Sequence, residues 1–148
     1  MAFSTIHAYS AEVANEGSGV IKGKVAAKVS KYKRDTVVYI ERVEGNFPPP
    51  QEHAKMDQIE LVFIPHVLVV LKGTTVDYNN SDDIAHNVFS PDDVADKMNL
   101  GTWLKGEVRP YTFNKLGAAA MLCNVHPEME AYVVVAQNPY FAKTDKEG

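Results

Sequence analysis

The sequence predicts an all-β sandwich of about eight strands. Short runs rich in β-branched and aromatic residues alternate with turn residues, which is typical of a sandwich rather than of alternating strands and helices. The 148 residues fit one domain, covering residues 1–148, because domains most often hold about 100–150 residues. Hydrophobic residues make up 45% and charged residues 23% of the chain, which indicates an ordinary globular protein.

The strands can be placed from their β-rich composition and the turns between them. A tight turn is predicted at Lys72 and Gly73. The candidate strands are Val20–Lys28, Thr36–Val43, Ile59–Phe63, Val67–Leu71, Thr74–Tyr78, Asn87–Phe89, Val108–Phe113, Ala118–Cys123 and Ala131–Gln137.

Two segments interrupt this pattern. Residues 46–51 contain three consecutive prolines, which remove three backbone donors, so the segment is predicted to be an exposed linker or lid. Ser90 and Pro91, followed by two aspartates, form a good helix start, which predicts one short helix near residues 91–98. The roles of the inserts at residues 44–58 and 91–106 stay open.

Composition excludes several classes of protein. A net charge of −4 gives no reason to expect nucleic-acid binding. The one basic cluster is interpreted as a solvated connection; it comprises Lys28, Lys31, Lys33 and Arg34. The longest wholly aliphatic run, Val67–Leu71, is far shorter than the roughly 20 residues of a membrane-spanning helix. Residues 1–10 lack the features of a secretory signal.

The chemistry concentrates in one short segment, which contains Cys123, His126 and Met129. A thiolate, an imidazole and a thioether suit copper better than zinc, which rarely takes a thioether, or than hard cations, which prefer oxygen. Two histidines and a cysteine with a weak axial methionine are the ligands of electron-transfer copper sites, so a second histidine is required.

Other interpretations of these residues compete with ligation. A lone cysteine or methionine is more often a core residue, and Met121 is a rival thioether on the strand before Cys123. We expect Met121 to pack in the core, because it lies roughly 6.6 Å along the strand from Cys123. His66 is expected to be structural or hydrogen-bonded.

His86 is the best candidate for the second histidine, since it follows a predicted strand and loop and precedes Asn87. The segments 73–79 and 83–88 resemble the first-ligand region of plastocyanin-like cupredoxins. The pattern Cys123-x-x-His126-Pro127-x-Met129 is similar to the contracted ligand loop of amicyanin. The resemblance extends from about residue 63 to residue 135.

This resemblance implies a Greek-key cupredoxin fold that binds one copper ion per chain. The implied ligands are His86, Cys123, His126 and Met129. Asn87, as the residue after the first histidine, is expected to tie the two ligand loops together. The implied function is that of a type 1 copper protein, which shuttles single electrons between redox partners and is not an enzyme. A cytochrome or an oxidoreductase is the expected partner, and the bacterial periplasm is the expected location. The oligomeric state stays open.

Copper storage or delivery, with the same ligands binding Cu(I), is the alternative. Such sites usually contain several thiolates or methionines, and this chain has one cysteine. A catalytic copper needs further histidines, and only His7, His53 and His66 remain.

Five acids between residues 82 and 96 suggest an acidic edge that orients a basic partner; they are Asp82, Asp83, Asp92, Asp93 and Asp96. The alternative is that two of them favour a helix start and the others are solvated.

Overall fold

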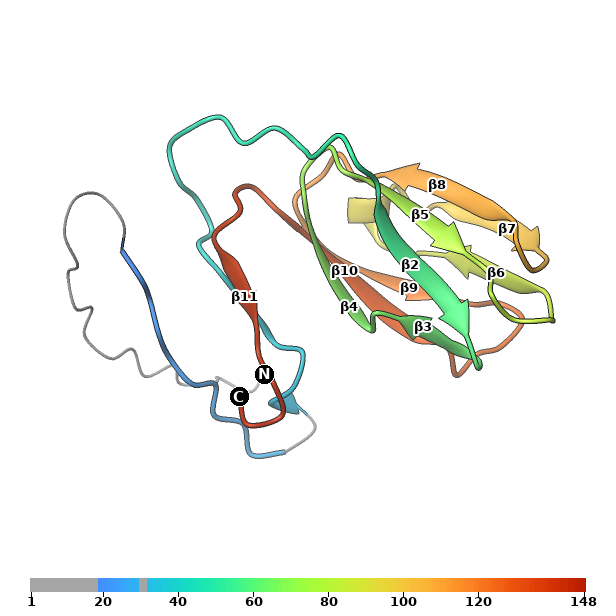
Figure 1. The fold of residues 1–148 in the computed structure, drawn as a ribbon, viewed down its shortest axis with the longest axis horizontal. Coiled ribbons are helices and arrows are strands. Elements are labelled where there is room, and N and C mark those ends of the chain that lie inside the picture. Colours follow the sequence, from blue (N-terminus) through green and yellow to red (C-terminus); the bar gives the residue numbers. More distant parts are fainter. Residues whose placement is uncertain (1–18, 30–31) are drawn as a thin grey trace. The chain divides into compact units, whose positions relative to one another are not determined.

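The computed structural model describes residues 19–29 and 32–148 (Figure 1). The chain forms two compact units. One consists of the described residues before Tyr39 together with Phe141–Gly148, and the other is Tyr39–Tyr140. The second unit contains the β-sandwich that the sequence predicts. In the described part of the chain, no helix has the length and apolar character that crossing a membrane needs.

The first sheet of the sandwich has four strands in the order β3-β2-β5-β8. The strands are β2 (Ala54–Ile59), β3 (Val62–Ile64), β5 (Thr75–Asn79) and β8 (Val108–Thr112). β2 runs parallel to β5, whereas β3 and β8 run antiparallel to their neighbours. Between β3 and β5 the chain crosses to the second sheet, a connection of the kind that Greek-key sandwiches contain.

The second sheet has five strands in the order β4-β10-β9-β6-β7. The strands are β4 (Val67–Leu71), β6 (His86–Phe89), β7 (Asn99–Trp103), β9 (Gly117–Leu122) and β10 (Glu130–Ala136). β6 and β9 are antiparallel neighbours, with Phe89 opposite Leu122. The beginning of β6 and the end of β9 therefore lie at the same end of the sandwich.

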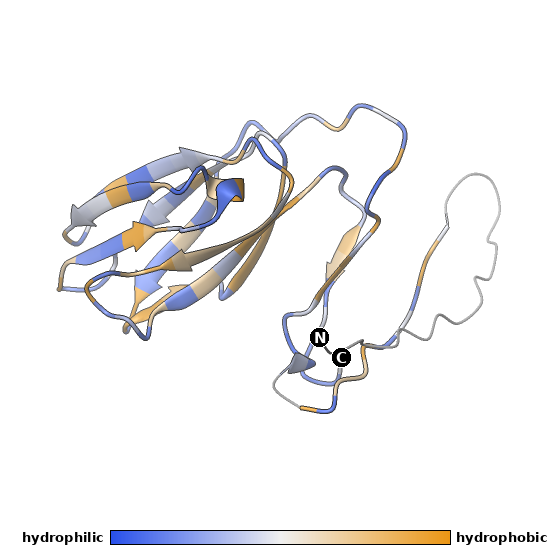
Figure 2. Cartoon of the chain, turned by 180° about the vertical axis from the view of Figure 1, so that it is seen from behind, coloured by the Kyte–Doolittle hydropathy of each residue, from blue (hydrophilic) through white to orange (hydrophobic). Residues whose placement is uncertain are grey.

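The core lies between the two sheets and follows the two-residue period of their strands. β5 buries Val76 and Tyr78, and β9 buries Ala119 and Met121, while the residues between them face outward. Figure 2 shows polar and apolar bands alternating along several of the strands. Each large apolar side chain buried in this way contributes about 1.5–3 kcal/mol to folding.

A separate two-stranded sheet pairs β1 (Val37–Tyr39) with β11 (Phe141–Lys143). The predicted strand at Thr36–Val43 is shortened to β1, and β11 was not predicted. The predicted strand at Val20–Lys28 is wrong, since only Gly23 there makes a strand-like bridge. Most of its side chains are exposed, including Ile21 at 78%, so its apolar residues have no second layer to bury them.

The predicted strand at Ile59–Phe63 is instead a hairpin, in which Ile59 ends β2 and Val62 begins β3. Glu60 and Leu61 both adopt positive φ angles, 53° and 62°, and reverse the chain between β2 and β3. Paired left-handed residues are the backbone of a tight hairpin turn, which usually contains Asn or Gly. Neither residue occurs here, so the sequence carries no turn signal.

The predicted helix near residues 91–98 is reduced to a single 3-10 turn, η2 (Asp93–Ala95). Asp92 rather than Ser90 precedes this turn, and its side chain does not cap it; its carboxylate instead accepts the Ala120 N–H at 2.7 Å. β7 follows and was not predicted as a strand.

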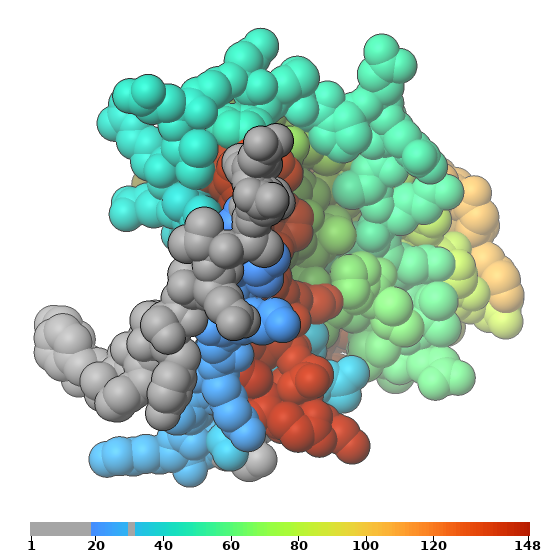
Figure 3. Space-filling model, turned by 60° about the vertical axis from the view of Figure 1, so that its left-hand side comes forward, coloured from blue at the N-terminus to red at the C-terminus, as the bar shows by residue number. Residues whose placement is uncertain are grey.

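The linker and the tight turn agree with the sequence prediction. Residues 48–53 are exposed and lie outside any strand, and Figure 3 shows this part of the chain (teal) on the surface. At the turn, Gly73 has a φ of 90° and the Thr74 N–H donates to the Leu71 carbonyl at 3.0 Å. The positive φ explains why glycine stands there.

Candidate metal centre

The sandwich brings three of the four predicted ligands together at one end. His86 is the first residue of β6, Cys123 directly follows β9, and His126 lies in the loop that leads to β10. Glu130 pairs with Leu122, so the strands close this loop at its base. Pairing between β6 and β9 then sets His86 beside the loop.

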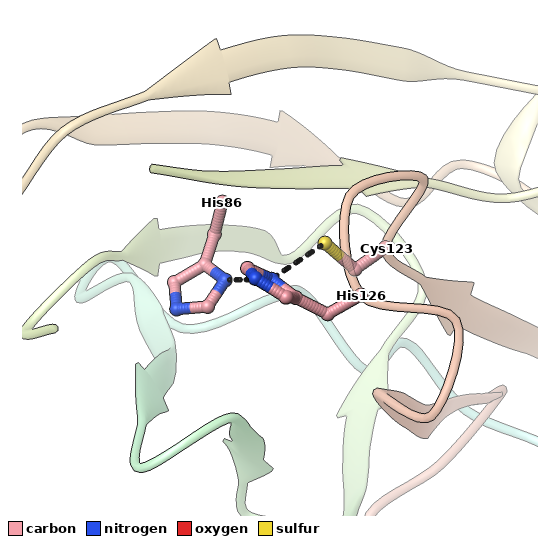
Figure 4. A group of neighbouring side chains, drawn as sticks. All are labelled: His86, Cys123 and His126. Carbon is pink, nitrogen blue, oxygen red and sulfur yellow. Dashed lines mark hydrogen bonds between the residues drawn. The ribbon is translucent and has the colours of Figure 1, made fainter. Parts of the chain in front are cut away.

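The donor atoms of these residues converge. The nitrogen and sulfur donors of His86, Cys123 and His126 lie within 4.8 Å of one another. His86 Nδ1 is 3.0 Å from His126 Nδ1, which is 3.9 Å from Cys123 Sγ (Figure 4). His86 and Cys123 are buried, with exposures of 0% and 3%, whereas His126 is half-buried. The cluster therefore has a closed inner side and one ring that reaches the surface.

The orientation of His86 depends on Asp82. His86 Nε2 is 2.8 Å from Asp82 Oδ2, so Nε2–H donates a hydrogen bond to the carboxylate. Nδ1 then carries no proton, and its lone pair faces Cys123 and His126. Burial raises the pKa of Asp82, but hydrogen bonds from His86 and from the N–H groups of Glu60 and Leu61 outweigh it and lower that pKa overall. The carboxylate is therefore anionic at neutral pH.

Asn87 ties the two ligand segments together, as the sequence predicts. Its Oδ1 accepts the Asn124 N–H at 3.2 Å, next to Cys123, and its own N–H points at Cys123 Sγ at 3.5 Å. Its Nδ2 donates to Asn99 Oδ1 at 2.9 Å and to the Gly101 carbonyl at 2.7 Å. One buried side chain thus fixes the cysteine loop against β6 and β7.

The two candidate methionines differ in their surroundings. Met129 is buried, and its N–H donates to the His126 carbonyl at 3.0 Å within the ligand loop. Met121 is also buried, but its Sδ accepts the Tyr78 hydroxyl at 3.0 Å inside the core. Burial raises the pKa of Tyr78, so this hydroxyl stays a donor. The prediction that Met121 packs in the core is confirmed.

The remaining histidines lie elsewhere. His66 Nδ1 is 3.1 Å from the Glu130 carbonyl and its ring meets the Tyr132 ring edge to face, which confirms that it is hydrogen-bonded away from the cluster. His53 pairs with Asp77 at 2.9 Å on the surface. His7 lies outside the described residues.

The acidic edge is largely neutralised, so the sequence interpretation of it needs correction. Asp82 points inward at His86, and Asp92 holds the Ala120 N–H. The other three acids each pair with a lysine from outside the 82–96 segment. These pairs are Asp83 with Lys105, Asp93 with Lys97, and Asp96 with Lys115. The sequence interpretation missed the role of Asp82, for which the only signal was its spacing of four residues from His86.

The donor set fits copper. Two imidazole nitrogens and one sulfur in a largely buried cluster are soft or borderline ligands, which select copper or zinc over magnesium or calcium. Among the described residues, the buried sulfur accepts one backbone N–H, that of Asn87 at 3.5 Å, so it keeps lone pairs with which to bind a metal. Together with the β-sandwich, this set defines the class of cupredoxins, small copper proteins.

Comparison with known proteins agrees with this class. The family of copper-binding proteins of the plastocyanin/azurin type matches residues 51–136, which is more than half of the chain. The chain therefore belongs to this family, and one copper ion is its cofactor. No significant match to a curated protein sequence was found.

Solved structures share the fold. A purple cupredoxin from Nitrosopumilus maritimus is 23% identical, with a TM-score of 0.52 over 56% of this chain and 99% of that one. A reduced amicyanin variant is 25% identical, with a TM-score of 0.54 over 60% and 91%. An oxidised amicyanin variant is 26% identical, with a TM-score of 0.53 over 56% and 81%.

Proposed function

We propose that this protein carries single electrons between redox proteins through one copper ion held by His86, Cys123, His126 and Met129. The observation that carries the proposal is the convergence of three donor atoms within 4.8 Å, two of them on fully buried side chains. When bound, copper supplies the one-electron Cu(II)/Cu(I) couple. We further propose that the chain works as a single cupredoxin domain, with this site in the unit Tyr39–Tyr140.

The role of the protein is to hold its donors in place before and after each transfer. His86 is anchored by Asp82, and the segment around Cys123 is anchored by Asn87. Side chains that are fixed by hydrogen bonds rearrange little when the charge of the copper ion they bind changes. Cys123 would supply the thiolate to the copper ion, and Met129 would supply a weak thioether donor that tunes the potential.

His126 is proposed as the route by which electrons leave. It is the half-buried member of the cluster, and its neighbours Val125 and Pro127 are exposed, Val125 at 47%. A partner that docks on this loop would approach the ring of His126 without any opening of the sandwich. The docking partner is a redox protein, either a cytochrome or an oxidoreductase.

Copper storage or delivery is the less favoured function. A delivery site has to release its metal, whereas His86 and Cys123 are buried and braced by neighbouring residues. No second cysteine is available to receive or pass on the ion.

The location proposed for the carrier is the bacterial periplasm. This proposal rests on the resemblance to amicyanin and can be tested by cell fractionation.

Voltammetry of the copper-loaded protein tests the carrier function. We expect a reversible one-electron wave that persists over repeated cycles, because both oxidation states stay bound. His126→Ala should abolish the reversible wave, whereas His66→Ala, a matched histidine away from the cluster, should keep it. Loss of copper on each reduction would instead favour delivery, and equal behaviour of the two variants would contradict the proposed ligand set.

A further inference from the structure

The carboxylate of Asp82 accepts three hydrogen bonds. Its Oδ1 accepts the Glu60 N–H at 2.7 Å, and its Oδ2 accepts the Leu61 N–H at 3.1 Å. Oδ2 also accepts Nε2–H of His86 at 2.8 Å. The two amides belong to the left-handed turn between β2 and β3, which points both N–H groups at one carboxylate. The turn and the first ligand are thereby joined through a single side chain.

The loop that carries Asp82 is also fixed. The Asp82 N–H donates to Asn80 Oδ1 at 2.9 Å. Asn80 is buried, and its Nδ2 donates to the Ile84 and Trp103 carbonyls at 2.9 and 3.0 Å. Because both ends of the segment are held, the carboxylate has little freedom to turn away from His86.

The negative charge of Asp82 is directed at His86. Within the described residues, Asp82 forms no ion pair with a lysine or arginine, and its side chain is only 16% exposed. Asp83, the next residue, has an 88% exposed side chain and pairs with Lys105 on the surface. The two adjacent acids therefore differ in environment, which makes Asp83 a matched control for Asp82.

We propose that Asp82 is a positioning residue that fixes the ring of His86 with Nδ1 toward the metal and increases its donor strength toward Cu(II). A carboxylate that accepts Nε2–H stabilises the tautomer in which Nδ1 is the ligand, and it makes that nitrogen more electron-rich. Because Cu(II) has the higher charge, a more electron-rich nitrogen strengthens the binding of Cu(II) more than that of Cu(I). This inference rests on the proposed function, since it takes His86 as a copper ligand.

The test compares Asp82→Asn with Asp83→Asn in copper-loaded protein. Loss of an outer-shell partner of a ligating histidine typically costs 10–100-fold in metal affinity. We expect at least a tenfold loss of Cu(II) affinity in Asp82→Asn with little change for Cu(I), which corresponds to a reduction potential about 59 mV higher. Asp83→Asn should match the wild type, and Asp82→Glu should recover part of the shift by restoring the charge.

The outcomes separate this inference from the proposed function. A wild-type protein without a copper–thiolate absorption band would overturn both. A normal wild type with equal potentials in the two asparagine variants, or lower stability of Asp82→Asn without any change of potential, would overturn the role of Asp82 alone. Should Asp82→Asn not fold, nitrogen NMR of the wild-type Cu(I) protein decides. A protonated, slowly exchanging Nε2 on His86 supports the inference, and an unprotonated Nε2 contradicts it.

Discussion

Asn87→Ala should destabilise the copper-free protein by about 2–3 kcal/mol. The Asn87 side chain makes three hydrogen bonds, to Asn99, Gly101 and Asn124, and the residue is 4% exposed. A hydrogen bond of this kind contributes about 1 kcal/mol net, which gives about 3 kcal/mol for the three. The estimate is lowered slightly because Asn99, Gly101 and Asn124 are exposed enough for water to replace part of the loss.

Urea unfolding of the copper-free protein measures this loss. The control is Asn114→Ala, since Asn114 is exposed and makes one long hydrogen bond of 3.4 Å to Thr112. That variant should change the free energy of unfolding by no more than about 0.5 kcal/mol. If Asn87→Ala cost no more than Asn114→Ala, the inference that Asn87 holds the two ligand segments together would be refuted.

Two further predictions concern the choice between the two methionines as copper ligand and the surface ion pair of Asp96. Met129→Leu should raise the reduction potential, because Cu(II) is less stable once the thioether donor is lost. Met121→Leu should leave the potential unchanged but lower the free energy of unfolding by about 1–3 kcal/mol, because it leaves the Tyr78 hydroxyl unpaired. A larger potential shift from Met121→Leu would show that the wrong thioether was chosen. Hydrogen bonds from Lys115 and then from Tyr111 lower the pKa of Asp96, so this carboxylate contributes stability above about pH 4 and loses that contribution as the pH falls further. In acid-unfolding experiments, Asp96→Asn should therefore lose less stability below about pH 4 than the wild type. Identical acid-unfolding profiles for the two proteins would contradict this.

The ligand cluster was predictable because its information is local. Cys123, His126 and Met129 stand within one short loop, and His86 stands at the start of a recognisable strand. Donor chemistry alone points to a soft metal, whatever the details of the fold. The strand at Thr75–Asn79 was predictable for a similar reason, since its buried Val76 and Tyr78 alternate with polar residues and burial on one face leaves a two-residue period.

Features that depend on distant partners were not predictable. Glu60 and Leu61 form a left-handed turn without any turn residue, so that turn depends on the surrounding sheet and on the carboxylate of Asp82. The sequence placed Asp82 in an acidic surface edge, because nothing in the chain near residue 82 reveals that its side chain turns inward. Val20–Lys28 shows the opposite error, because it has strand composition and lacks a sheet that buries it.

The visible absorption spectrum of the Cu(II)-loaded protein, measured beside Cys123→Ser, tests the central claim most directly. Cys123 is the only cysteine in the chain, so any thiolate-to-Cu(II) band must come from it. We expect an intense visible band in the wild type and none in Cys123→Ser, whose fold should be intact by circular dichroism because serine is close to cysteine in size. A band of equal strength in both proteins, or a colourless wild type that binds copper only as Cu(I), would contradict the assignment of an electron-transfer copper site.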